Sequence, residues 1–157
     1  HSPVAIVPQT SRRDGQGIVV GVDESDASRS AIRFAATEAE RTRQPLIFLR
    51  ASDAPGVPED RDDEQRERDR YFERQTKSIL SDAKDIAKSV GPSVDVRERS
   101  VRRPAAEALL DSSASADLLV IGSSRRNGSA GRMLGSVSHD VLINLVGPTI
   151  VVRGDGR

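Results

Sequence analysis

The stretch from residue 117 to residue 153 constrains the fold of this chain most. It begins with an apolar run at residues 118–121 in which polar and apolar side chains do not alternate. Such a run is typical of a strand covered on both faces, as in the parallel sheet of an α/β protein. A long glycine-bearing segment follows, and then a helix expected to begin at Gly135 and Ser136 and a last strand at residues 149–152. This order of elements predicts an α/β fold.

The segment between that strand and that helix has the ingredients of a phosphate-binding site. Glycine lets the backbone approach a ligand closely, and the first N–H groups of a helix can bind an anion. Open α/β sheets bind ligands at the carboxyl ends of their strands, where this segment lies. Glycine and serine are also ordinary loop residues, and neither the P-loop nor the G-x-G-x-x-G pattern is present, so the spacing leaves both interpretations open. The residues concerned are Gly122, Gly128, Gly131, Gly135, Ser123, Ser124, Ser129 and Ser136.

The composition argues against several classes of function. Lysine plus arginine equals aspartate plus glutamate, 24 of each, whereas a nucleic-acid-binding domain usually has a basic excess. With three Phe, one Tyr and no Trp, the chain has few aromatic side chains that could stack on bases. There is no cysteine, and neither His1 nor His139 belongs to a cluster spaced for metal ligation. With no long apolar run and no signal-peptide pattern, we expect a cytoplasmic protein that does not span a membrane.

Strand and helix patterns alternate along the chain. Alternating elements with short connections predict a parallel sheet with helices on both faces and right-handed crossovers. The helix after the first strand has an alanine-lined face that suits close packing on a sheet. Residues 59–74 are mostly charged, with both signs mixed, which is typical of a solvated helix surface or a loop. The strands are expected at residues 18–22, 46–49, 94–101, 118–121 and 149–152.

Two of the later helices carry further expectations. Pro104 is expected in the first turn of the helix after the third strand, where a missing N–H costs nothing. Val137, Val141 and Leu145 recur in steps of four and are expected on one face of the last helix.

Asp23 is a candidate ligand-binding carboxylate. It follows the first predicted strand, and Ser25 or Asp26 is expected to cap the helix after it. A carboxylate at this end of a strand can accept hydrogen bonds from a ribose or a base, or it can simply cap the turn. The residues alone leave both roles open.

An enzymatic role has the least support in the sequence. The consecutive residues Ser138, His139 and Asp140 cannot act as a catalytic triad, because neighbouring side chains on a helix point about 100° apart. No pair of carboxylates and no set of metal ligands stands near the glycine-bearing segment.

The start of the chain resembles its end. Residues 2–8 (SPVAIVP) and residues 147–153 (GPTIVVR) both place a small residue before proline and then a short β-branched run. Residues 9–17 are polar and glycine-bearing, as in a linker. Residues 1–16 are therefore either the last strand of an upstream sister domain with its linker, or an N-terminal edge strand of this domain. The domain proper is expected over residues 17–153, with a tail at residues 154–157.

Four short motifs together resemble a universal stress protein domain over residues 17–153. Each motif is weak alone, but they occur in the order and spacing of that family. The resemblance implies a five-stranded parallel α/β sheet of Rossmann-like type, related to the adenine nucleotide alpha hydrolases, here with an extra N-terminal strand. The motifs are V-D-x-S at residues 22–25, V-I-G-S at 120–123, L-G-S-V-S at 134–138 and G-P-T-I-V-V-R at 147–153.

The resemblance also implies a binding site for ATP, with or without Mg²⁺. The ATP-binding branch of the family carries G-x-x-G-x9-G-[ST], which falls here on Gly122, Arg125, Gly135 and Ser136, so that arginine replaces the second glycine. The family would place Asp23 near the ribose or base, and Val22 and Ala51 near the adenine. The implied cofactor-binding set is Val22, Asp23, Ala51, Gly122, Arg125, Gly135, Ser136 and Val137.

Arg125 separates two functional hypotheses. Its side chain either blocks a phosphate cradle built for glycine or clamps a phosphate with its guanidinium. The first hypothesis is a stress-response regulatory module that binds ATP, and the second is a domain without nucleotide that serves in dimerisation or assembly. Slow ATP hydrolysis or self-phosphorylation is implied only because some relatives show it.

The expected partner is a second domain of the same kind. In the family the last strand commonly pairs across a two-fold axis, which here would join Thr149, Ile150, Val151 and Val152 of two domains in a homodimer. In a tandem protein, residues 2–8 would take the partner's place against this strand and form a pseudo-dimer.

Overall fold

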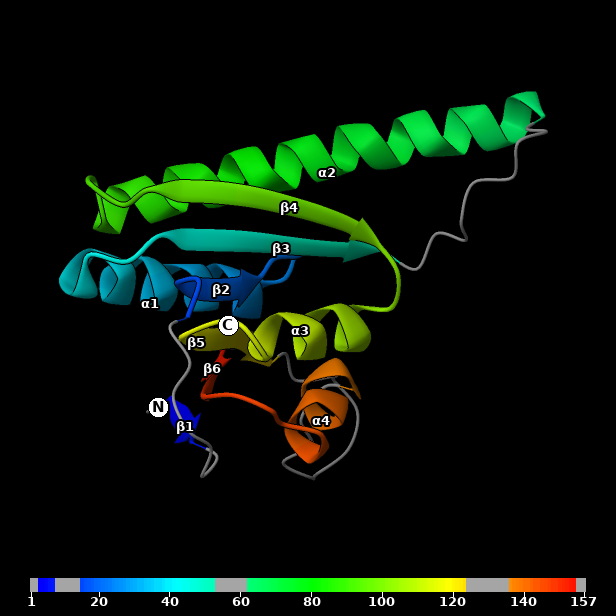
Figure 1. The fold of residues 1–157 in the computed structure, drawn as a ribbon. Coiled ribbons are helices and arrows are strands. Elements are labelled where there is room, and N and C mark those ends of the chain that lie inside the picture. Colours follow the sequence, from blue (N-terminus) through cyan, green and yellow to red (C-terminus); the bar gives the residue numbers. More distant parts are fainter. Residues whose placement is uncertain (1–2, 8–14, 53–61, 124–135, 155–157) are drawn as a thin grey trace.

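The strands of the computed structural model form one sheet (Figure 1), and the model describes residues 3–7, 15–52, 62–123 and 136–154. Within these ranges the sheet has six strands in the order β1-β6-β5-β2-β3-β4. Five strands are parallel, and β1 alone runs antiparallel to its neighbour β6. The strands are β1 (Val4–Ile6), β2 (Ile18–Gly21), β3 (Leu46–Ser52), β4 (Val96–Arg102), β5 (Leu118–Ser123) and β6 (Thr149–Arg153).

Helices cover both faces of the sheet, as the alternating pattern predicted. The helices are α1 (Asp26–Thr42), α2 (Asp63–Val90), α3 (Ala105–Ser113) and α4 (Ser136–Ile143). Side chains alternate between faces along each strand, so Val20 packs in the core under α1 and α2 while Val19 packs in the core under α3 and α4. Both faces of the central strands are buried, which explains their unbroken apolar runs.

The alanine-lined face of α1 is buried, as expected. Ala31, Ala35 and Ala36 have no exposed surface. Their small side chains let α1 lie close to the sheet. The helix begins after Ser25, whose Oγ accepts a hydrogen bond from the Ser28 N–H at 3.1 Å. The strand before it, β2, ends at Gly21, one residue earlier than predicted.

The charged stretch proves to be helical in its described part. Asp62 caps α2, and the helix continues for 28 residues to Val90. Its first turns are exposed, and its N-terminal end extends past the carboxyl edge of the sheet (Figure 1). Arg102 at the end of β4 contacts Asp69 of α2, with 3.3 Å between Nη1 and Oδ1.

Several element boundaries differ from those expected. The strand predicted at residues 46–49 continues to Ser52, because β3 pairs with β4 along its whole length. Pro104 precedes α3 in an extended conformation (φ −50°, ψ 134°) and does not lie in its first turn. Leu145 lies beyond the end of α4, although it packs in the same core as Val141.

The N-terminal strand β1 pairs with the last strand β6, the place that residues 2–8 were expected to take in a tandem protein. Val4 is paired with Val151, Ala5 with Ile150 and Ile6 with Thr149. Both Val4 and Ile6 are exposed on this edge of the sheet. In the described ranges, every helix is too short or too polar to cross a membrane.

Candidate functional site

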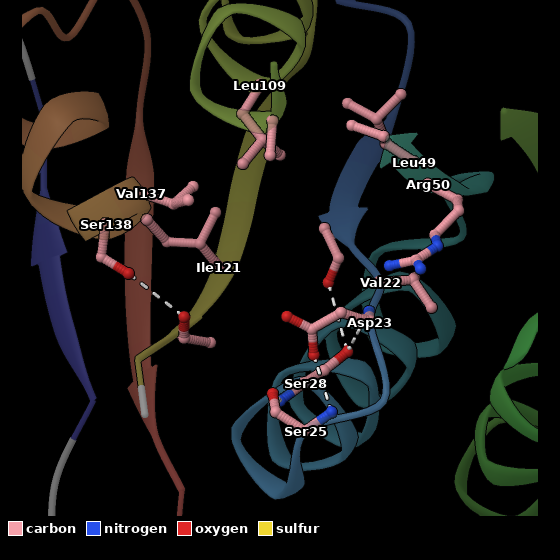
Figure 2. Close-up of a pocket in the computed structure, with 14 residues that line it drawn as sticks. Val22, Asp23, Ser25, Ser28, Leu49, Arg50, Leu109, Ile121, Val137 and Ser138 are labelled. Carbon is pink, nitrogen blue, oxygen red and sulfur yellow. Dashed lines mark hydrogen bonds between the residues drawn. The ribbon is translucent and has the colours of Figure 1, made fainter. Parts of the chain in front are cut away.

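A pocket of about 240 Å³ opens at the carboxyl ends of β2, β3 and β5 (Figure 2). The starts of α1, α3 and α4 complete its walls. This is the edge at which parallel α/β sheets bind their ligands. The sequence-predicted residues Val22, Asp23, Ala51, Gly122 and Val137 all line it.

The remaining predicted residues are only partly accounted for. Ser136 is the first residue of α4, which places the start of that helix beside the pocket residue Val137. Arg125 and Gly135 lie outside the described residues, as does the side chain of Ser136.

Asp23 is held in the turn between β2 and α1 by two hydrogen bonds. Its Oδ1 accepts from the Ser25 N–H at 2.8 Å, and its own N–H donates to the Ser28 Oγ at 3.0 Å. The carboxylate therefore caps the turn, as one of the two interpretations proposed. In the part of the chain that the structure describes, its second oxygen has no hydrogen-bond partner, and Figure 2 shows that oxygen pointing away from the turn. One oxygen of an exposed carboxylate is thus left for a ligand.

Gly122 lies where β5 meets the first turn of α1. A Cβ atom at this position would stand 2.5 Å from the carbonyl carbon of Ala27 and 2.6 Å from its oxygen. The carbonyl oxygen of Gly122 accepts a hydrogen bond from the Ser138 Oγ at 3.2 Å, which joins β5 to α4. Close packing against the backbone of α1 therefore requires a glycine here, whatever the ligand.

One wall of the pocket is apolar. Leu49, Leu109 and Ile121 come from β3, α3 and β5, and each is less than 7% exposed. Ala51 packs against the same cluster and continues this wall, whereas Val22 lines the pocket with its side chain buried in the core on the other face of the sheet. A surface of this kind suits a flat apolar group such as an aromatic base.

Arg50 lines the pocket but was not predicted as a site residue from the sequence. Its side chain is 13% exposed, its Nη1 stands 3.7 Å from the Glu24 Oε2, and its guanidinium carbon lies 6.0 Å from the centre of the Phe72 ring. Its Nε is buried and has no hydrogen-bond partner within the described ranges. No periodic pattern marked it, because it lies one residue beyond the strand predicted at residues 46–49.

Two serines were also missed as parts of the site. Ser28 and Ser138 both line the pocket and are almost fully buried. Each uses its hydroxyl to fix a turn at the pocket, Ser28 by accepting from Asp23 and Ser138 by donating to Gly122. For Ser28, the available signal was a serine on the otherwise alanine-lined face of α1. His139 is 65% exposed on its side chain, whereas Ser138 is buried, so the two side chains lie apart.

The pocket residues suit binding through shape and hydrogen bonds. The pocket combines an apolar wall, one carboxylate with a free oxygen and one arginine side chain that is 13% exposed. Among the described residues, no group of three or more His, Cys, Asp or Glu side chains is arranged to hold a metal ion.

Curated relatives match most of this chain. A universal stress protein of Mycobacterium tuberculosis is 35% identical over 98% of the chain and 50% of the relative. A universal stress protein of Mycolicibacterium smegmatis is 33% identical over 90% of the chain and 49% of the relative. The chain spans about half the length of these curated relatives.

Solved structures share the fold over most of their length. A universal stress protein in complex with cAMP has a TM-score of 0.65 and 29% identity, over 91% of this chain and 100% of that one. The universal stress protein of Archaeoglobus fulgidus in complex with dAMP has a TM-score of 0.61 and 25% identity, over 89% of this chain and 99% of that one. The model of the universal stress protein family matches residues 16–153. The chain therefore belongs to the universal stress protein family.

Proposed function

We propose that this domain binds an adenine nucleotide in the pocket and acts as a cytoplasmic regulatory module of a stress response. The observation that carries the proposal is the meeting of an apolar wall, the free oxygen of Asp23 and the close-packed Gly122 in one pocket. The relatives solved with cAMP and dAMP support an adenine nucleotide as the ligand.

Each part of the nucleotide has a suitable partner. The base would pack on Val22 and Ala51, and the ribose would lie by Asp23. The phosphates would lie between Gly122 and the start of α4, where free N–H groups of a helix favour an anion. The glycine pattern at Gly122, Gly135 and Ser136 favours ATP, and Arg125 would then contact a phosphate.

Stabilisation by the nucleotide tests this proposal. A ligand that binds only the folded chain raises its stability, by ~1.4 kcal/mol when the free ligand is about ten times its Kd. For a domain of this size we expect ATP with Mg²⁺ to raise the Tm by about 3–6 °C. Inorganic tripolyphosphate is the control, since it has no base or ribose. An equal shift with tripolyphosphate, or no shift with ATP, would contradict the proposal.

Assembly through β6 is a second candidate function. The pairing of β1 with β6 favours it, because it shows that the outer edge of β6 accepts a further strand. In an assembled protein that strand would come from a second domain, and Thr149, Ile150 and Val151 would form the pairing positions. This function does not require a bound nucleotide.

Removal of residues 1–7 should promote self-association. Without β1, the backbone groups along the outer edge of β6 lose their partners, and an unpaired edge favours pairing with another chain. We expect the shortened chain to dimerise in sedimentation velocity at concentrations at which the full chain does not. A synthetic peptide of residues 1–8 should reverse this dimerisation. A shortened chain that stays monomeric would argue against β6 as an assembly strand.

A further inference from the structure

Helix α2 is anchored to the apolar core by its second half. Its contacts with the core that it shares with α1 come from residues 79–87, whereas none of the described residues 63–76 belongs to that core. The side chains that make these contacts are Ile79, Leu80, Ala83, Ile86 and Ala87. The first half of the helix therefore gains little from apolar packing, which is what usually stabilises a helix in a folded protein.

The interface under the first half of α2 is polar. In the ranges that the structure describes, the buried side-chain polar atoms without a hydrogen-bond partner are Arg50 Nε, Ser52 Oγ and Thr76 Oγ1. Arg50 and Ser52 lie on the face of β3 that carries Phe48, and the ring of Phe72 from α2 lies 6.0 Å from the Arg50 guanidinium carbon. Buried polar atoms are nearly always hydrogen-bonded, so these three atoms disfavour the packed arrangement.

Arg102 of β4 joins the sheet to this half of the helix. Its guanidinium stands 3.3 Å from Asp69 and 3.9 Å from Glu73, whose side chain is 71% exposed. Ion pairs with exposed partners contribute little to stability. The ion pairs within residues 63–68 join side chains about one turn apart, so they stabilise the helical turns but not the contact with the sheet.

We propose that residues 63–76 of α2 open away from β3 as one segment while residues 79–90 stay packed. Opening returns the three unpartnered atoms to water and gives up no contact with the apolar core. It also uncovers Arg50, which lines the pocket and is 13% exposed on its side chain in the closed arrangement. The segment thereby regulates how much positive charge the pocket presents, and this inference does not depend on which ligand the pocket binds.

Labelling of a single introduced thiol in the full chain tests the inference, because the sequence contains no cysteine. Thr76→Cys places the thiol in the first half of α2, at a residue that is 8% exposed, and Ala83→Cys is the matched control in the second half, at a residue that is 1% exposed. A buried thiol behaves as a small apolar group, so Thr76→Cys does not itself favour the opening.

We expect a thiol reagent to label the Thr76 variant at least about a hundredfold faster than the Ala83 variant. The rate at Thr76 should also depend less on urea, because a local opening exposes less surface than global unfolding does. Equal rates with the same urea dependence would overturn the inference, since all of α2 would then open only when the domain unfolds. Thermal unfolding of each variant shows that the comparison is made between folded chains.

Hydrogen exchange of the unmodified chain gives a second measurement that needs no substitution. We expect the backbone amides of residues 70–76 to exchange at least about a hundredfold faster than those of residues 80–87. Equal protection of the two halves of the helix would contradict the proposed opening.

Arg102→Met tests the attachment of the segment to the sheet. Loss of the contacts with Asp69 and Glu73 should raise the labelling rate of Thr76→Cys by about two- to fivefold. Arg97→Met is the control, because Arg97 pairs with Asp95 at 2.9 Å and this pair stays intact when α2 opens. Equal effects of the two substitutions would overturn the role of Arg102.

Discussion

Replacing Gly122 with alanine should lower the free energy of unfolding by about 3 kcal/mol, at the upper end of the usual cost of overpacking. The added Cβ would stand 2.5 and 2.6 Å from the carbonyl group of Ala27 and 2.8 Å from the backbone nitrogen of Ser28. These atoms belong to the backbone of the first turn of α1, so no side-chain rotation can relieve the contact. Thermal unfolding should show a Tm lower by about 6–12 °C.

The matched control is Gly21→Ala, at the end of the adjacent strand. Its Cβ would meet the Leu109 Cδ2 at 3.1 Å, which is the end of a flexible side chain. We expect a loss below about 1 kcal/mol. If Gly122→Ala lowers the free energy of unfolding no more than Gly21→Ala does, the close packing of β5 against α1 does not explain the need for glycine at position 122. If the predicted loss of stability is found, a Gly122 variant that fails to bind nucleotide reports on folding as much as on the phosphate site.

Replacing Ala51 with phenylalanine should abolish nucleotide binding while the fold is kept. Ala51 stands at the end of β3, half-buried on the apolar wall of the pocket. A phenyl ring there would occupy the space that we assign to the base. We expect the affinity for ATP to fall by about a hundredfold or more, equal to ~2.7 kcal/mol, in calorimetric titration.

Ser100→Phe is the control for this substitution. Ser100 is an exposed residue of β4, paired in register with Arg50, and it does not line the pocket. The same ring there should leave ATP affinity unchanged. Tight ATP binding by Ala51→Phe would place the base elsewhere and contradict the proposed binding mode.

The local pattern of the sequence predicted the elements but not their full extent. The alanine-lined face of α1 was evident from spacing alone, because the residues that face the sheet recur with the helical period. The full length of β3 was not evident, since Arg50 and Ser52 belong to the strand only through pairing with β4. The spatial order of the strands depends likewise on pairing between distant segments, which periodicity does not encode.

The site residues that belong to a sequence motif were predicted. Those that reach the site only through tertiary contacts were missed. Asp23 and Gly122 were identified from their places at strand ends, and both line the pocket. Arg50 carries no motif, and its enclosure arises from Phe72, a residue of α2 that is distant in the sequence. Gly122 was read as a phosphate-binding glycine, and the structure adds a packing reason that the sequence could not show.

The most direct test of the central claim is a calorimetric titration of the unmodified chain with ATP and Mg²⁺, run beside the Arg125→Gly variant. We predict saturable binding of one ATP by the unmodified chain, with affinity equal to or greater than that of the variant. Binding by Arg125→Gly alone would mean that arginine blocks the site, and would favour assembly through β6 as the function of this chain. Absence of binding by both proteins would contradict the account of the pocket as a nucleotide site.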